Sequence, residues 1–98
     1  MRVLMTVTLD TDKTNQAIRD DVLPKTIKAA MEALRPEAAY FVTKNGRRTG
    51  FFVFDLVDVT DLPSAAEPFF QGMDAEIEVT PVMTFEDVQA GLQKLGAR

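Results

Sequence analysis

FFVFDLVDV, residues 51–59, has the composition of a β-strand with apolar residues on both of its sides. Successive side chains of a strand point to opposite faces of a sheet. The first face carries Phe51, Val53, Asp55 and Val57, and the second carries Phe52, Phe54 and Leu56. A chain of 98 residues can cover one face of a sheet with its own helices but has little left for the second. The stretch therefore predicts a partner on whichever face the helices leave uncovered, most simply another copy of the same chain.

The rest of the sequence predicts a single α+β domain over residues 1–98. Alternating apolar residues predict strands, and helical spacing together with capping residues predicts helices. The predicted elements are a strand over 2–9, a helix from about 13 to 34 that Pro24 either kinks or restarts, a strand over 37–44, a turn over 45–50, the strand over 51–59, a short helix from 61 to about 72, a strand over 74–82 and a last helix capped by Thr84. This β-α-β-β-α-β order plus a C-terminal helix predicts a ferredoxin-like fold, with an antiparallel four-stranded sheet and its helices on one face.

Composition narrows the classes of function. The net charge of −4 argues against nucleic acid or an anionic membrane as the main partner. The chain has no cysteine and no histidine, so thiolate chemistry, thiolate metal sites and the usual haem ligand are absent. No cofactor and no metal are expected. Absence of cysteine fits a cytoplasmic protein, and no segment approaches the roughly 20 apolar residues of a membrane span.

The hairpin between the second and third strands predicts which side chains share the open face. A two-residue turn at Asn45-Gly46 pairs residue 44 with residue 47, and a turn at Arg47-Arg48 pairs 46 with 49. Both choices give the same facing, whereas a loop of odd length would reverse it. An unpaired carboxylate is costly in a helix-packed core, so Asp55 is assigned to the open face. The residues predicted on that face are Leu4, Thr6, Thr8, Tyr40, Val42, Phe51, Val53, Asp55, Val57, Glu76, Glu78 and Thr80.

With this element order, the two-faced third strand and the segments LPSAAEPFF at 62–70 and EIEVTPVM at 76–83, the chain resembles the dimeric α/β-barrel superfamily. It is similar to an uncharacterised bacterial branch near the stress-responsive A/B-barrel proteins and the monooxygenase-like proteins. The resemblance implies ferredoxin-like subunits whose sheets pair into a dimeric barrel. None of the matching segments is a catalytic motif. The cofactor-free monooxygenases of this group use Asn, Trp or His beside the substrate, and this chain has neither Trp nor His.

Tyr40 and Asp55 form the candidate catalytic pair. If they are cross-strand neighbours, the carboxylate can accept the phenol proton, hold a polar ligand group or act as a general base. The alternative is that the two side chains only satisfy each other inside the dimer.

The candidate ligand-binding residues are Thr6, Thr8, Phe51, Val53, Glu78 and Arg19, the last at the mouth of the cavity. Arg19 is otherwise part of an exposed helix face. Asp55, Glu76 and Glu78 together offer oxygen ligands for a hard cation. The alternative for the two glutamates is a solvated edge or an ion pair with Arg2, Arg47 or Arg48.

Two hypotheses about function follow. In the first, the protein is a small homodimer that binds or transforms a small, partly apolar metabolite without a cofactor, as a monooxygenase- or isomerase-like protein. In the second, it is a non-enzymatic structural or regulatory homodimer whose barrel is filled by side chains. A cavity of roughly 300 Å³ or more favours the first.

Overall fold

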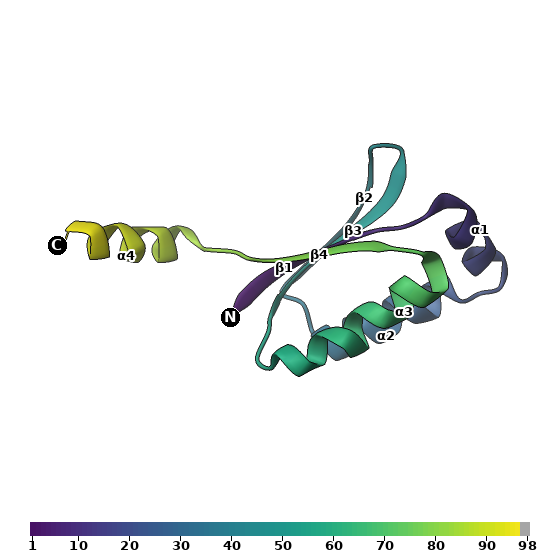
Figure 1. Cartoon of the computed structure of the whole chain (residues 1–98), viewed down its shortest axis with the longest axis horizontal. Helices are drawn as coiled ribbons and strands as arrows, with labels where there is room; N and C mark the ends of the chain where they lie inside the picture. The colour runs from purple at the N-terminus through teal and green to yellow at the C-terminus, as the bar shows by residue number, and fades with distance from the viewer. Residues whose placement is uncertain (97–98) are drawn as a thin grey trace.

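The computed structural model describes residues 1–96 and shows an α+β domain built on one four-stranded antiparallel sheet. Figure 1 shows α2 and α3 on one side of the sheet, and the other side is left open. The elements in chain order are β1 (Arg2–Thr8), α1 (Thr11–Arg19), α2 (Leu23–Leu34), β2 (Ala38–Lys44), β3 (Arg47–Asp55), the 3-10 turn η1 (Val59–Asp61), α3 (Leu62–Met73), β4 (Glu76–Pro81) and α4 (Phe85–Gly96). The strands lie in the order β2-β3-β1-β4, so β1 and β3 are central and β2 and β4 are edges.

The core lies between the sheet and the helices. Alternate residues of β1 and β3 point to the helix side, and Met5, Phe52 and Phe54 are buried there. From α3, Phe69 and Met73 close the same cluster. The facing predicted for the third strand is therefore confirmed, because Phe52 and Phe54 are buried while Phe51 and Val53 are only half-buried.

The β2–β3 hairpin turns at Asn45-Gly46 and pairs Lys44 with Arg47. Both turn residues have positive φ, 53° at Asn45 and 76° at Gly46, as the two-residue turns that suit twisted strands require. This is one of the two registers that the sequence allowed. The predicted turn over 45–50 was too long, since β3 begins at Arg47.

The third strand also ends earlier than predicted. β3 stops at Asp55, whereas the sequence predicted a strand as far as residue 59. Asp55 pairs with Arg2, the first residue of β1, and beyond this pair only one further backbone hydrogen bond follows, from the Leu56 N–H to the Met1 carbonyl. As a result Val57 is 85% exposed in the loop after β3 and does not join the open face.

Two helices occupy the segment predicted as one helix over 13–34. α1 ends at Arg19, and Asp21 then takes a positive φ of 57°, which turns the chain. Pro24 lies in the first turn of α2, where its missing N–H would have no helical partner. The alternative in which Pro24 restarts the helix is therefore the one observed. α3 continues through Pro68 to Met73, one residue beyond the predicted end.

α4 extends away from the body of the domain (Figure 1). Its apolar stripe of Phe85, Val88, Leu92 and Leu95 is exposed, and none of its described residues is buried. The predicted cap is present: the Thr84 N–H donates to Asp87 Oδ2 at 3.0 Å, and the Asp87 N–H donates to Thr84 Oγ1 at 3.2 Å. Such a reciprocal pair fixes where the helix begins. Within residues 1–96 no helix combines the length and the apolar character that a membrane crossing requires.

Acid is expected to loosen the first turn of α4. The backbone N–H and then the hydroxyl of Thr84 lower the pKa of Asp87 below the ordinary aspartate value. A lowered folded-state pKa means that the cap is complete above about pH 3.9 and is lost as the pH falls through the lower value. Backbone NMR shifts of residues 85–88 should therefore move toward coil values only at strongly acidic pH. Thr84→Ala should show the loosened turn already at neutral pH, and shifts that do not respond to either change would contradict the cap.

Candidate functional site

The sheet register arranges the open face in rows that cross all four strands. One row runs from Val42 through Thr49 and Thr8 to Glu76. The next runs from Tyr40 through Phe51 and Thr6 to Glu78, and the third from Ala38 through Val53 and Leu4 to Thr80. The face is thus polar near the hairpin and becomes more apolar toward the opposite end of the sheet.

A hollow of about 410 Å³ lies on the polar part of this face. Its volume is within the range of small-molecule sites. β1 supplies the floor, β4 one wall, and the hairpin with the start of β3 the other wall. The lining residues are Thr6, Thr8, Lys44, Asn45, Arg47, Thr49, Glu76 and Glu78. Three of the predicted ligand-binding residues, Thr6, Thr8 and Glu78, are therefore brought together.

The hollow carries charges of both signs. Lys44 and Arg47 come from the hairpin, and Glu76 and Glu78 come from β4 on the other side of the floor. Arg47 Nη1 lies 3.6 Å from Glu76 Oε1, so this pair bridges the two walls. An ion pair between Arg47 and one of the two glutamates was one of the alternatives that the sequence left open. The hydroxyls of Thr6, Thr8 and Thr49 add neutral donors and acceptors between the charged walls.

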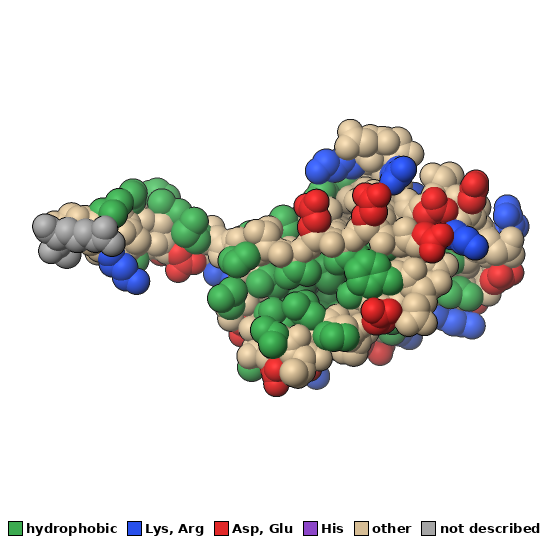
Figure 2. Space-filling model, in the orientation of Figure 1, with side chains coloured by type: hydrophobic (Ala, Val, Ile, Leu, Met, Phe, Trp, Pro, Cys, Tyr) green, Lys and Arg blue, Asp and Glu red, His purple; other side chains and the backbone are tan. Residues whose placement is uncertain are grey.

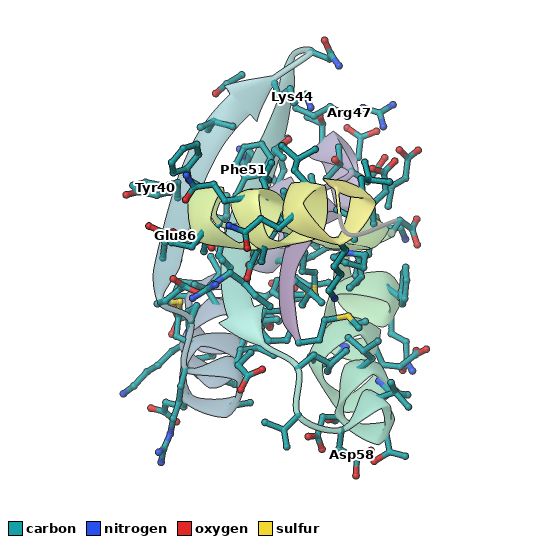
Figure 3. The ribbon with its side chains drawn as sticks, turned by 90° about the vertical axis from the view of Figure 1, so that its left-hand side faces the viewer. Tyr40, Lys44, Arg47, Phe51, Asp58 and Glu86 are labelled. Carbon is teal, nitrogen blue, oxygen red and sulfur yellow. The ribbon has the colours of Figure 1, made fainter. Side chains whose placement is uncertain are left out.

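An apolar patch adjoins the hollow. Phe51 lies in the same row as Thr6 and Glu78, on the side of the row toward β2, and the ammonium of Lys44 sits 5.8 Å from the centre of the Phe51 ring. Figure 3 shows Tyr40, Phe51, Lys44 and Arg47 in the upper part of the view, with Asp58 far below them. Val53 lies one row further along, beside Leu4. The predicted residues Phe51 and Val53 therefore border the hollow's apolar side and do not line the hollow itself.

The candidate pair of Tyr40 and Asp55 is not formed. Tyr40 lies opposite Phe51, whereas Asp55 lies four residues further along β3, opposite Arg2. Four residues of strand correspond to about 13 Å. The Asp55 carboxylate instead accepts a hydrogen bond of 2.8 Å from the amino group of Met1, and its side chain is 71% exposed. The condition for the pair was cross-strand contact, and the register shows that this contact is absent.

Arg19 and the proposed cation ligands are also dispersed. Arg19 is at the end of α1, where it donates to Gln16 Oε1, and it does not line the hollow. Asp55 is at the far end of the sheet from Glu76. In the described part of the chain, His, Cys, Asp and Glu side chains form no group of three or more suited to hold a metal.

Charged side chains at the far end of the sheet make hydrogen bonds to one another and to the neighbouring loop. Arg2 on β1 donates to Glu37 just before β2, and this hydrogen bond and the Glu37 charge raise the pKa of Arg2. The loop that follows β3 is held by Asp58, which accepts from the N–H and the hydroxyl of Thr60, and these two bonds lower the pKa of Asp58. The Arg2 and Asp58 side chains are both in contact with solvent, and their hydrogen bonds hold the chain in place at this end of the sheet.

Sequence reasoning missed part of the hollow. Lys44, Asn45, Arg47, Thr49 and Glu76 line it, yet none of them was a predicted ligand-binding residue. Arg47 and Thr49 were placed in a turn, because polar residues at 45–50 looked like a loop. The signal was present in the first of the two predicted registers, since a two-residue turn at Asn45-Gly46 puts the next residues into the strand.

A family model described as Domain of unknown function (DUF3303) matches residues 1–96. A search of curated proteins finds no match.

Proposed function

This chain belongs to the DUF3303 family, and we propose that it binds a small, partly apolar molecule in a chamber formed by the open sheet faces of two identical copies. The observation that carries the proposal is the hollow of about 410 Å³ with its adjoining apolar patch on an otherwise uncovered sheet. A second copy turns this open hollow into an enclosed site. Enclosure is what small-molecule sites need, because they bury most of the ligand surface.

The fold supports a face-to-face homodimer of ferredoxin-like subunits in the manner of a dimeric α/β barrel. Two crossover units, β1 to β2 through α1 and α2 and β3 to β4 through α3, leave α2 and α3 on one side of the sheet (Figure 1). The first crossover contains two helices, α1 and α2, where the ferredoxin-like fold has one. The other side exposes large apolar side chains, with Tyr40 68% and Val42 41% exposed. Monomeric proteins rarely leave such a face uncovered.

The chemistry of the hollow indicates which part of a ligand goes where. Polar groups of the ligand would meet the hydroxyls of Thr6 and Thr8, with Glu78 as an acceptor and Lys44 as a donor. Its apolar part would lie over Phe51 and Val53. Asp55 is not assigned a role in this site. We propose a cytoplasmic location, and the cysteine-free composition supports it.

Native mass spectrometry of the purified protein tests the proposal. The expected result is a dimer that carries one small molecule per subunit, which denaturation releases for identification. Thr6→Val removes a hydroxyl from the floor of the hollow and should lower the ligand-bound fraction about tenfold, consistent with a buried polar group of the ligand left unpaired. Thr80→Val makes the same change on the open face outside the hollow and should leave occupancy unchanged. A dimer that carries nothing would instead support the filled, structural barrel.

A further inference from the structure

The exposed helix α4 is the most unusual feature of this chain. An amphipathic helix of 12 residues with no buried side chain is not stable through packing of its own. Its stripe of Phe85, Val88, Leu92 and Leu95 spans about 15 Å of helix. Figure 2 shows hydrophobic side chains mainly along the upper side of α4, the side of the open sheet face, and charged ones mainly below. The stripe is thus turned toward the space that a second copy would occupy.

A second apolar surface lies at the other end of the molecule. A groove of about 400 Å³ opens on the helix side of the β2–β3 hairpin. Its apolar lining includes Leu9, Leu23, Ile27, Phe41 and Phe52. Phe41 is 55% exposed although it packs edge-on against the buried Phe52 ring, with 5.8 Å between the ring centres. Arg48 also lines the groove, opposite in sign to the acidic first turn of α4.

The chain's own α4 cannot reach this groove. α4 leaves from β4 at the end of the sheet where Val82 is hydrogen-bonded to Arg2. The groove is at the opposite end and on the opposite edge, beside β2, in a molecule 57 Å long. The three residues 82–84 that connect β4 to α4 span at most about 11 Å. The occupant of the groove must therefore come from another molecule.

A two-fold axis that runs across the strands, between two facing sheets, exchanges the two ends of the molecule. Figure 1 shows the hairpin rising on the open side at one end and α4 extending beyond the other end. This axis exchanges the ends of the molecule but not its edges, and in the end view α4 runs across the width of the sheet, below the hairpin (Figure 3). The hairpin of one copy therefore comes down beside α4 of the other. Because α4 lies beyond the end of the strands, it meets the outer, helix side of that hairpin, where the groove opens. A two-fold makes the contact reciprocal, so both stripes and both grooves are covered at once.

We propose that α4 of each copy packs its apolar stripe into the groove behind the β2–β3 hairpin of the second copy. This inference rests on the homodimer of the proposed function. It adds that each chain clasps its partner from outside the chamber, and that each hairpin is held by the partner's last helix. Since Lys44, Asn45 and Arg47 belong to that hairpin, the partner's α4 also fixes one wall of the binding hollow.

Matched substitutions on α4 of the full chain test the contact. Leu92→Asp places a charge on the stripe and should weaken the dimer. In sedimentation analysis its dissociation constant should rise at least tenfold. Ala90→Asp makes a similar change on the opposite side of the helix and should stay within about twofold of the wild type. Neither residue is buried in the isolated chain, so both variants should fold. Equal effects of the two variants, or none from Leu92→Asp, would overturn the proposal.

Disulfide trapping between two different chains locates the contact. One chain carries Leu92→Cys and a mass tag, and the other carries Thr43→Cys at the exposed rim of the groove. The chain has no natural cysteine, so a mixed disulfide can form only between these positions. The mixed dimer should form on mild oxidation, and Ala90→Cys in place of Leu92→Cys should reduce its yield at least tenfold.

The other outcomes separate the two proposals. A wild type that is dimeric by native mass spectrometry but gives no mixed disulfide would overturn the α4 contact and leave the face-to-face dimer standing. A product made only of two Leu92→Cys chains would mean that α4 pairs with α4, which also overturns it. A monomeric wild type at micromolar concentration would remove the homodimer and this inference together.

Discussion

Phe51→Asp is expected to convert the protein into a folded monomer at concentrations at which the wild type is a dimer. Phe51 lies near the centre of the open face and is not part of the core on the helix side. In the proposed dimer the new carboxylate of each copy would be taken out of water on the apolar part of the face, where the neighbouring Lys44 ammonium offsets its charge only in part. An unpaired buried charge costs about 3–5 kcal/mol, which corresponds to at least about a hundredfold in the dissociation constant. Sedimentation velocity measures this change directly.

Val57→Asp is the matched control. Val57 was predicted on the open face together with Phe51, but it lies beyond the end of β3 and is largely exposed. A new charge there stays in water and should leave the dissociation constant within about twofold. If Phe51→Asp remains as dimeric as Val57→Asp, the open face is not the interface.

Phe52→Ala is expected to lower the free energy of unfolding by about 3–5 kcal/mol, because it removes a whole buried ring. Phe52 is 1% exposed and touches Phe41 from β2 and Phe69 from α3, so its ring joins the sheet to the helix layer. A domain of this size has a total stability of about 5–15 kcal/mol, so a large fraction would be lost. Urea unfolding at one fixed protein concentration gives the value, since dimer stability depends on concentration.

Phe70→Ala is the control that shows whether the loss of stability depends on burial or only on the removal of a phenylalanine. Phe70 is next to Phe69 on α3 but is 40% exposed. Its removal exposes less of the core and should cost clearly less than the loss of Phe52. Equal losses from the two substitutions would mean that the core does not lie where the structure places it.

The adjacent residues Phe51 and Phe52 show why much of the fold could be predicted from sequence. Strand periodicity is a local property, so the apolar alternation of β1, β3 and β4 identified the strands and separated their two faces. Pairing is not local. The end of β3 depends on where β1 begins, and no pattern within 51–59 contains that information. The division of the segment 13–34 was predicted only as one of two alternatives, because apolar spacing continues through Asp21 and Pro24 allows either a kink or a second helix.

Site residues were predicted correctly only where their position depends on nothing more than which face of the sheet the side chain points to. Thr6, Thr8 and Glu78 follow from alternation on two neighbouring strands, and they do meet. Tyr40 and Asp55 share a face as predicted, but register sets the distance between them, and a shared face does not imply contact. Arg19 depended on how α1 is oriented over the sheet, which is a tertiary property. Arg47 required the exact length of the hairpin loop.

The placement of α4 outside the core separates two tasks along the chain. Residues before about 82 determine whether the domain folds, while the stripe on α4 contributes nothing to that core. In the proposed dimer, substitutions along the stripe would therefore change which chains associate without a penalty to the folding of either. Two diverged copies of such a gene within one cell could be kept from mixing, or made to mix, by a few side chains of the last helix.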